Sequence, residues 1–189
     1  MAIEPEAARA TLVLLHGRAH EASSMRELAA RLELEDVACV APEAPGNTWY
    51  PQRFREPRAA NEPQLSESLG TVHAILDDLE VRGVAPGRIV LGGFSQGACL
   101  ASEALARRPR PVGALAVLCG GLIGIEAELA TPAAGSLAGV PVLLTGTEGD
   151  DWVPVDRVLA TAEALGAAGA EVELRIFAPA PHEVHPEEV

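Results

Sequence analysis

A serine framed by glycines stands where an apolar, strand-like run gives way to a helix-like one. Residues 88–101 read RIVLGGFSQGACLA, which places Ser95 between Gly93 and Gly97 in the pattern G-x-S-x-G. A serine on such a tight strand-to-helix turn has its hydroxyl lifted above the sheet, where it can act as a nucleophile. A plain glycine turn is the alternative, because a Gly-rich chain can contain the pattern by chance. The strand pattern before Ser95 and the helix pattern after it favour the nucleophile.

A serine hydroxyl is a weak nucleophile, so a general base and an orienting acid must accompany it. When the serine occupies this kind of turn, the acid and then the histidine follow it along the chain. Asp150 and Asp151 come after one later apolar run, and His182 and His185 come after the last one. His182 follows a short Pro-rich loop and is the predicted base, and His185 is expected to be a solvated neighbour. The segment HEVH lacks the spacing of a helical zinc pair, so no metal site is expected.

Acyl transfer also needs two backbone N–H groups that stabilise the tetrahedral intermediate. Gln96, directly after the serine, supplies one of them. The loop that follows the first apolar run, LLHGRAH, is expected to supply the other. Gly17 lets this loop turn sharply, which makes the N–H of Arg18 the predicted second donor. His16 in the same loop is interpreted as a packing residue.

These residues need a scaffold, and short apolar runs alternate with helix-like segments along the whole chain. The predicted strands are Thr11–Leu15, Val37–Val40, Arg88–Leu91, Ala114–Leu118, Val140–Leu144 and Val172–Phe177. The predicted helices are Ser24–Leu32 with a serine cap, Gln64–Arg82, Ala98–Arg107 and Val155–Gly166. Such alternation predicts an α/β protein with a mostly parallel sheet of about six strands and helices on both faces. Residues 1–189 are expected to form one domain.

Two connections, Pro42–Pro63 and Gly120–Gly139, are longer than ordinary loops, and long loops are usually functional or disordered. The first contains NTWYPQRF, with Trp49, Tyr50 and Phe54. Pockets are lined mainly by apolar and aromatic side chains, so this loop is predicted to border the acyl pocket. The alternative is that the aromatic rings only hold a long loop against the body.

Composition limits the partners and the compartment. The chain has 27 acidic and 14 basic residues, a net charge of −13, and such a surface repels nucleic acid and anionic membranes. The N-terminus lacks the apolar stretch of a signal peptide or membrane span, so the expected location is the cytoplasm, without membrane insertion. Three cysteines, an odd number in apolar surroundings, are expected to be buried reduced thiols. No cofactor is expected, and a homodimer stays open.

At these residues the chain resembles the phospholipase/carboxylesterase family of α/β hydrolases, which includes acyl-protein thioesterases and small bacterial esterases. The resemblance runs through LLHGR, APxAPxNTWYP, GFSQGA, CGG, the DxxVP of residues 150–154 and the final PHEV. It implies an α/β-hydrolase fold, with Ser95 as nucleophile, Asp150 and His182 as its partners, and Arg18 and Gln96 as oxyanion donors. Asp151 is then expected to face outward and to cap the following helix.

Two features depart from the family pattern. Thr145 stands where the family commonly has a histidine, which leaves the predicted triad intact. The family usually continues after the catalytic histidine into a terminal helix, whereas this sequence reaches Val189 just as HPEEV begins to resemble a helix start.

The predicted function is hydrolysis of small carboxylic esters or thioesters through a Ser-His-Asp triad and an acyl-enzyme intermediate. A lysophospholipase or acyl-protein thioesterase with a long acyl groove is the alternative within the same chemistry. A binding module that kept the triad but lost turnover is the alternative from another class, because a fold alone does not determine function.

Overall fold

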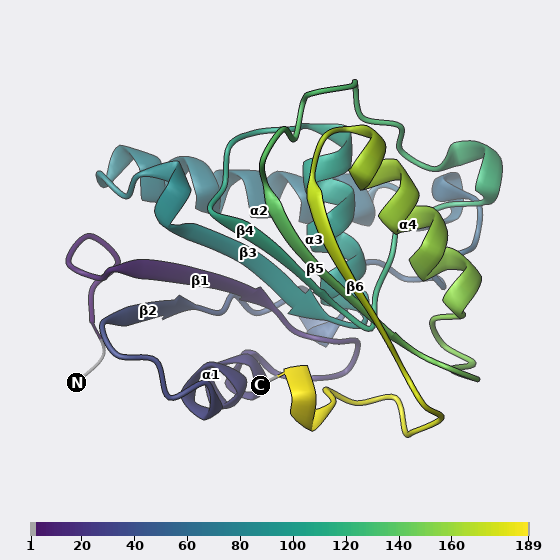
Figure 1. Ribbon diagram of the computed structural model, residues 1–189, viewed down its shortest axis with the longest axis horizontal. Coiled ribbons are helices and arrows are strands. Elements are labelled where there is room, and N and C mark those ends of the chain that lie inside the picture. Colours follow the sequence, from purple (N-terminus) through teal and green to yellow (C-terminus); the bar gives the residue numbers. More distant parts are fainter. Residues whose placement is uncertain (1–2, 189) are drawn as a thin grey trace.

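The structure is a computed structural model, and it describes residues 3–188. A parallel sheet with the strand order β2-β1-β3-β4-β5-β6 forms its centre (Figure 1). The strands are β1 (Ala10–Leu15), β2 (Val37–Val40), β3 (Ile89–Phe94), β4 (Ala114–Leu118), β5 (Pro141–Thr147) and β6 (Glu171–Phe177). The α-helices are α1 (Ala22–Arg31), α2 (Gln64–Val81), α3 (Gln96–Arg107) and α4 (Val155–Ala167). The predicted α/β architecture with a parallel sheet is therefore confirmed.

Helices cover both faces of the sheet, because successive side chains of its inner strands point to opposite faces and both sets are apolar. In β1, Leu12 and Leu14 pack with Met25 of α1, whereas Val13 and Leu15 belong to the larger core beneath α2, α3 and α4. In Figure 1, α1 accordingly lies apart from the other three helices, across the sheet from them.

Two element boundaries differ clearly from the sequence prediction. Strand β3 continues through the glycines to Phe94, so Ser95 follows the strand directly. Helix α1 begins at Ala22 with Glu21 as its N-cap, and Ser24 donates its hydroxyl proton to the carbonyl of Glu21 instead of capping the helix. The expected serine cap is therefore wrong, because the helix starts half a turn earlier than the pattern indicated.

Strand β6 is an edge strand, and most of its side chains are exposed. After it the chain turns back toward α1, where Pro186–Glu188 forms a single 3-10 turn at the position of the expected helix start. Val189 lies outside the described residues. Within residues 3–188 no helix combines the length and the apolar character needed to span a bilayer.

Candidate active site

Ser95 occupies a strained turn between β3 and α3. Its φ and ψ angles are 54° and −117°, a conformation that non-glycine residues rarely adopt and that costs on the order of 1–3 kcal/mol. The flanking glycines make this turn sterically feasible. A Cβ atom at Gly93 would lie 2.6 Å from the carbonyl oxygen of Leu15, and one at Gly97 would overlap the same carbonyl group. The backbone N–H of Ser95 donates to the carbonyl of Leu118 at 2.9 Å, which ties the turn to the neighbouring strand.

Three side chains from separate loops meet at this turn. The hydroxyl oxygen of Ser95 lies 2.8 Å from Nε2 of His182, and Nδ1 of His182 lies 2.6 Å from Oδ2 of Asp150. Asp150 is held by the other carboxylate oxygen, since Oδ1 accepts hydrogen bonds from the backbone N–H groups of Trp152 (2.7 Å) and Val153 (3.1 Å). His182 is thus within hydrogen-bonding distance of both other residues of the predicted triad, Ser95 and Asp150.

The hydrogen-bond partners determine where the imidazole carries its proton. An ionised Asp150 carboxylate can only accept, so Nδ1 of His182 is the protonated nitrogen and donates to it. Nε2 is then an acceptor, and the hydroxyl of Ser95 donates to it. The ring of Phe94 packs against the imidazole with 5.1 Å between ring centroids. This arrangement can take a proton from the serine as its oxygen attacks an electrophile.

Asp151 and His185, the alternatives to Asp150 and His182 in the sequence, lie outside the hydrogen-bonded triad. Asp151 is exposed, as expected, but α4 has Pro154 as its N-cap and lacks a side-chain cap, so the expected capping by Asp151 is wrong. His185 is half-buried and stacked on Phe177 with 4.0 Å between ring centroids. It is therefore a packed residue and not the solvated neighbour that was expected.

The predicted oxyanion donors border the same cavity as Ser95. Among residues 3–188, the backbone N–H groups of Arg18 and Gln96 have no backbone acceptor. For Gln96 this follows from its position, because the first N–H groups of a helix have no partner within it. His16 is fully buried, its Nε2 accepts from the N–H of Ala44, and its ring packs against Trp49. These contacts fit the packing role that was predicted for His16.

The cavity next to Ser95 has a volume of about 300 Å³, at the lower end of the range for small-molecule sites. Its lining contains Gly17, Arg18, Ala19, His20, Tyr50, Arg53, Phe54, Phe94, Ser95, Gln96, Cys99, Trp152, Val153 and His182. Of the three aromatic residues predicted to bind substrate, Tyr50 and Phe54 are in this wall. Trp49 is not, because it lies behind the wall with its indole N–H donating to the carbonyl of His16 at 2.9 Å. The prediction for Trp49 is corrected accordingly.

The side chains of the two predicted oxyanion residues hold the aromatic loop in place. The guanidinium of Arg18 donates to the carbonyls of Tyr50 (2.9 Å), Pro51 (2.9 Å) and Gln52 (2.6 Å). The amide of Gln96 accepts from the N–H of Trp49 at 3.0 Å and donates to the carbonyl of Tyr50 at 2.8 Å. The loop that forms the cavity wall is therefore fixed by hydrogen bonds on two sides.

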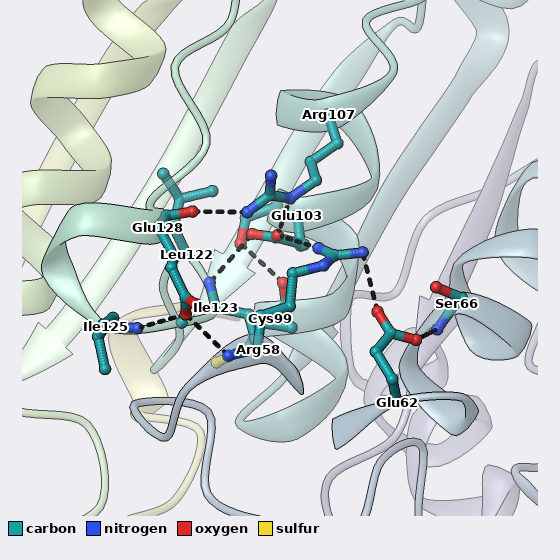
Figure 2. A network of polar contacts seen from close by, with 12 residues as sticks. Arg58, Glu62, Ser66, Cys99, Glu103, Arg107, Leu122, Ile123, Ile125 and Glu128 are labelled. Carbon is teal, nitrogen blue, oxygen red and sulfur yellow. Dashed lines mark hydrogen bonds and ion pairs between the residues drawn. The ribbon is translucent and has the colours of Figure 1, made fainter. Parts of the chain in front are cut away.

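A buried carboxylate of α3, that of Glu103, is the centre of a polar network (Figure 2). Glu103 is fully buried, and it binds the guanidinium groups of Arg58 and Arg107 and the backbone N–H of Ile123. Glu128 accepts from the N–H of Arg58 at 2.8 Å. These contacts attach the loop after β2 and the loop after β4 to the helix that begins directly after Ser95.

Metal-ligating residue types also meet at this site. The ligand atoms of Cys119, Asp150 and His182 lie within 4.8 Å of one another. Burial raises the pKa of the Cys119 thiol to about 12. The carboxylate and the imidazole of this group are already engaged with each other.

Sequence reasoning did not single out several residues of the cavity wall, among them His20, Arg53, Phe94 and Trp152. Each is next to, or within, a motif that was recognised: Phe94 immediately precedes the serine, and Trp152 lies inside DxxVP. Their positions inside or directly beside these motifs were the signal that could have found them.

The structure has an α/β-hydrolase fold, and comparison with known proteins gives the family. The Phospholipase/Carboxylesterase family profile matches residues 2–189, so the chain belongs to this family. The resemblance inferred from the motifs is thereby confirmed. The chain is similar to lysophospholipase-like protein 1 of Mus musculus, with 30% identity over 131 residues, 59% of this chain and 54% of that protein. The matched region thus spans about half the length of that relative.

Solved structures agree with the family assignment. The chain superimposes on a phospholipase/carboxylesterase from Dyadobacter fermentans with a TM-score of 0.93 and 32% identity, covering 100% of this chain and 90% of that one. A carboxylesterase from Mesorhizobium loti matches with a TM-score of 0.76 and 25% identity, covering 96% and 85% of the two chains.

Proposed function

We propose that this protein hydrolyses small carboxylic esters or thioesters with Ser95 as nucleophile, His182 as general base and acid, and Asp150 as the orienting acid. One observation carries the proposal: the continuous hydrogen-bonded series from the Ser95 hydroxyl through the imidazole to the Asp150 carboxylate, at 2.8 and 2.6 Å. Membership of the phospholipase/carboxylesterase family and the similarity to carboxylesterases support it.

In the acylation step, the oxygen of Ser95 attacks the substrate carbonyl carbon while its proton passes to Nε2 of His182. Asp150 stabilises the imidazolium that forms, because its carboxylate already accepts the Nδ1–H. The negative charge on the carbonyl oxygen is stabilised by the backbone N–H groups of Arg18 and Gln96 and by the N-terminus of α3. The imidazolium then protonates the leaving alcohol or thiol, which departs and leaves an acyl-serine.

Deacylation follows the same steps, with water as the attacking nucleophile and Ser95 as the leaving group. Nε2 accepts a proton from the water as its oxygen attacks the acyl carbon, and the same proton returns to Ser95 when the acid leaves. The sum is ester plus water to acid plus alcohol, so the side chains present supply the chemistry without a further reactant.

The cavity volume bears on the choice between short and long acyl groups. A space of about 300 Å³ suits a compact substrate better than an extended fatty acyl chain. The named relative from Mus musculus keeps lysophospholipase activity as the second candidate. Hydrolysis rates over p-nitrophenyl esters from acetate to palmitate separate the two, since a long-chain optimum would favour the lysophospholipase.

Substitution of Ser95 tests the proposal. Ser95→Ala should keep the fold and lower ester hydrolysis by roughly a millionfold, the usual cost of losing a triad nucleophile. A fluorophosphonate probe should label the wild type once, at Ser95, and should not label the variant. More than a tenth of the activity remaining in Ser95→Ala would refute the serine mechanism. A wild type that neither reacts with the probe nor turns over any ester would instead favour a non-catalytic binding module.

A further inference from the structure

The charge of the cavity wall is opposite to the charge of the protein as a whole. The chain carries 27 acidic and 14 basic residues, yet among residues 3–188 the charged members of the lining are two arginines, Arg18 and Arg53. A cleft lined by one sign of charge concentrates the field and attracts ligands of the opposite sign. The lining therefore favours an anionic substrate.

The two arginines differ in how their charges are used. The guanidinium of Arg18 donates to three backbone carbonyls and so holds the aromatic loop in place. Arg53 takes part in hydrogen bonds through its backbone carbonyl, but among residues 3–188 its guanidinium has no carboxylate or other acceptor within bonding distance. A guanidinium with unused donors at the edge of a cavity is able to bind an anion there.

An aromatic ring holds this guanidinium at the cavity mouth. The guanidinium carbon of Arg53 lies 5.1 Å from the centroid of the Trp152 ring, within the range of a cation–π contact. Trp152 is 59% exposed and lines the cavity, and the loop that carries it also carries Asp150. The cation thus lies on the wall of the same cavity into which Ser95 opens, and the contact limits the positions that its long side chain adopts.

We propose that Arg53 is the anion subsite of this cavity, and that the preferred substrates are small esters carrying a second, anionic group, a carboxylate or a phosphate. This inference rests on the proposed esterase function. The planar guanidinium presents paired N–H donors that match either anion in a bidentate manner. Hydrolysis proceeds as before, and the anion is bound but not altered.

Matched ester pairs test the inference. Monoethyl succinate carries a carboxylate where ethyl 4-methylpentanoate carries an isopropyl group of similar shape. A second pair, 1-butyrylglycerol 3-phosphate and 1-butyrylglycerol, presents the anion as a phosphate on the alcohol side. We expect the wild type to have a higher kcat/KM for the charged member of at least one pair, by about tenfold, the size of one hydrogen bond to a charged group. The pair with the larger preference identifies the source of the anion.

Variants assign the preference to Arg53. Arg53→Gln should lower the ratio of kcat/KM for the charged ester to that for the neutral ester about tenfold, mainly by raising KM for the charged ester. Arg53→Lys should retain part of the preference, because it keeps the charge but loses the bidentate geometry. Arg55→Gln is the matched control, since Arg55 pairs with Asp156 at 3.1 Å and is outside the cavity lining. The wild-type preference should also weaken as salt is raised, because the subsite is exposed.

Two outcomes overturn the inference and are distinguishable. If neutral esters are hydrolysed in a Ser95-dependent reaction but neither charged ester is preferred, or Arg53→Gln lowers both members of a pair equally, the anion subsite is wrong and the esterase function stands. If no ester is hydrolysed in a Ser95-dependent reaction, the proposed function fails, and this inference fails with it.

Discussion

Replacing Asp150 by asparagine should disable the site through the tautomer of the histidine. Oδ1 of Asp150 accepts two backbone N–H groups, at 2.7 and 3.1 Å, so only an oxygen atom can occupy that position. In Asp150→Asn the amide oxygen must stay there, and the NH2 group then faces Nδ1 of His182. Because the NH2 group donates, Nδ1 becomes an acceptor and the imidazole proton moves to Nε2. A protonated Nε2 cannot take the proton of Ser95.

The size of the effect follows from this loss of the base. A triad histidine held in the wrong tautomer lowers kcat by roughly ten-thousandfold, about 5.5 kcal/mol in activation free energy. KM should change little, because the buried carboxylate is not part of the cavity lining. Steady-state hydrolysis of p-nitrophenyl acetate gives both constants, and a circular dichroism melt verifies the fold.

Asp151→Asn provides the matched control, since it removes the same charge from the adjacent, exposed residue. Its kcat should fall by at most about tenfold. The reasoning is refuted if Asp150→Asn retains more than a tenth of the wild-type kcat, or if Asp151→Asn is the more damaged of the two.

Two further predictions concern stability. Glu103→Ala should lower Tm by about 5–10 °C in calorimetry, because removing one member of a buried ion-pair cluster costs about 3 kcal/mol and leaves the N–H of Ile123 without its acceptor; a Tm within about 2 °C of the wild type would contradict this. Burial, with Arg108 and Arg110 nearby, lowers the pKa of His73 below its ordinary 6.5. The unfolded chain therefore binds the proton more tightly than the folded protein does. The free energy of unfolding consequently decreases as the pH falls below about 6.5. His73→Leu should flatten the dependence of the unfolding free energy on pH between about 7 and 5 in urea titrations, and an unchanged slope would count against this account.

Much of the site could be predicted because the chemistry lies at strand ends, and strand ends can be recognised locally. Ser95, Asp150 and His182 each follow an apolar run, and the carboxyl ends of parallel strands meet at one edge of a sheet. The boundaries of the strands were harder to predict. The apolar pattern of β3 ends at Leu91, yet the strand continues because Gly92 and Gly93 pair with Ala116 and Val117 of β4. Pairing with a distant strand leaves no local pattern.

The orientation of the aromatic loop could not be predicted for a related reason. Its composition indicates a wall, but which ring faces the cavity depends on bonds from residues far along the chain. Gln96 binds the backbone of Trp49 from 47 positions away, and the indole of Trp49 binds the carbonyl of His16 from 33 positions away. These bonds turn Trp49 inward, whereas Tyr50 and Phe54 are among the residues that line the cavity.

The double use of Arg18 and Gln96 has a consequence for changing this protein by design. Their backbone N–H groups are the proposed oxyanion donors, and their side chains fasten the loop that shapes the acyl wall. A change of the wall that moves the backbone at Tyr50 should therefore also displace the proposed oxyanion donors, and variants selected for new substrates would then lose turnover. Phe54 offers a more independent position, because its ring packs on the guanidinium of Arg157, 5.5 Å away, instead of on the oxyanion loop. Variation there would alter acyl preference while turnover is kept.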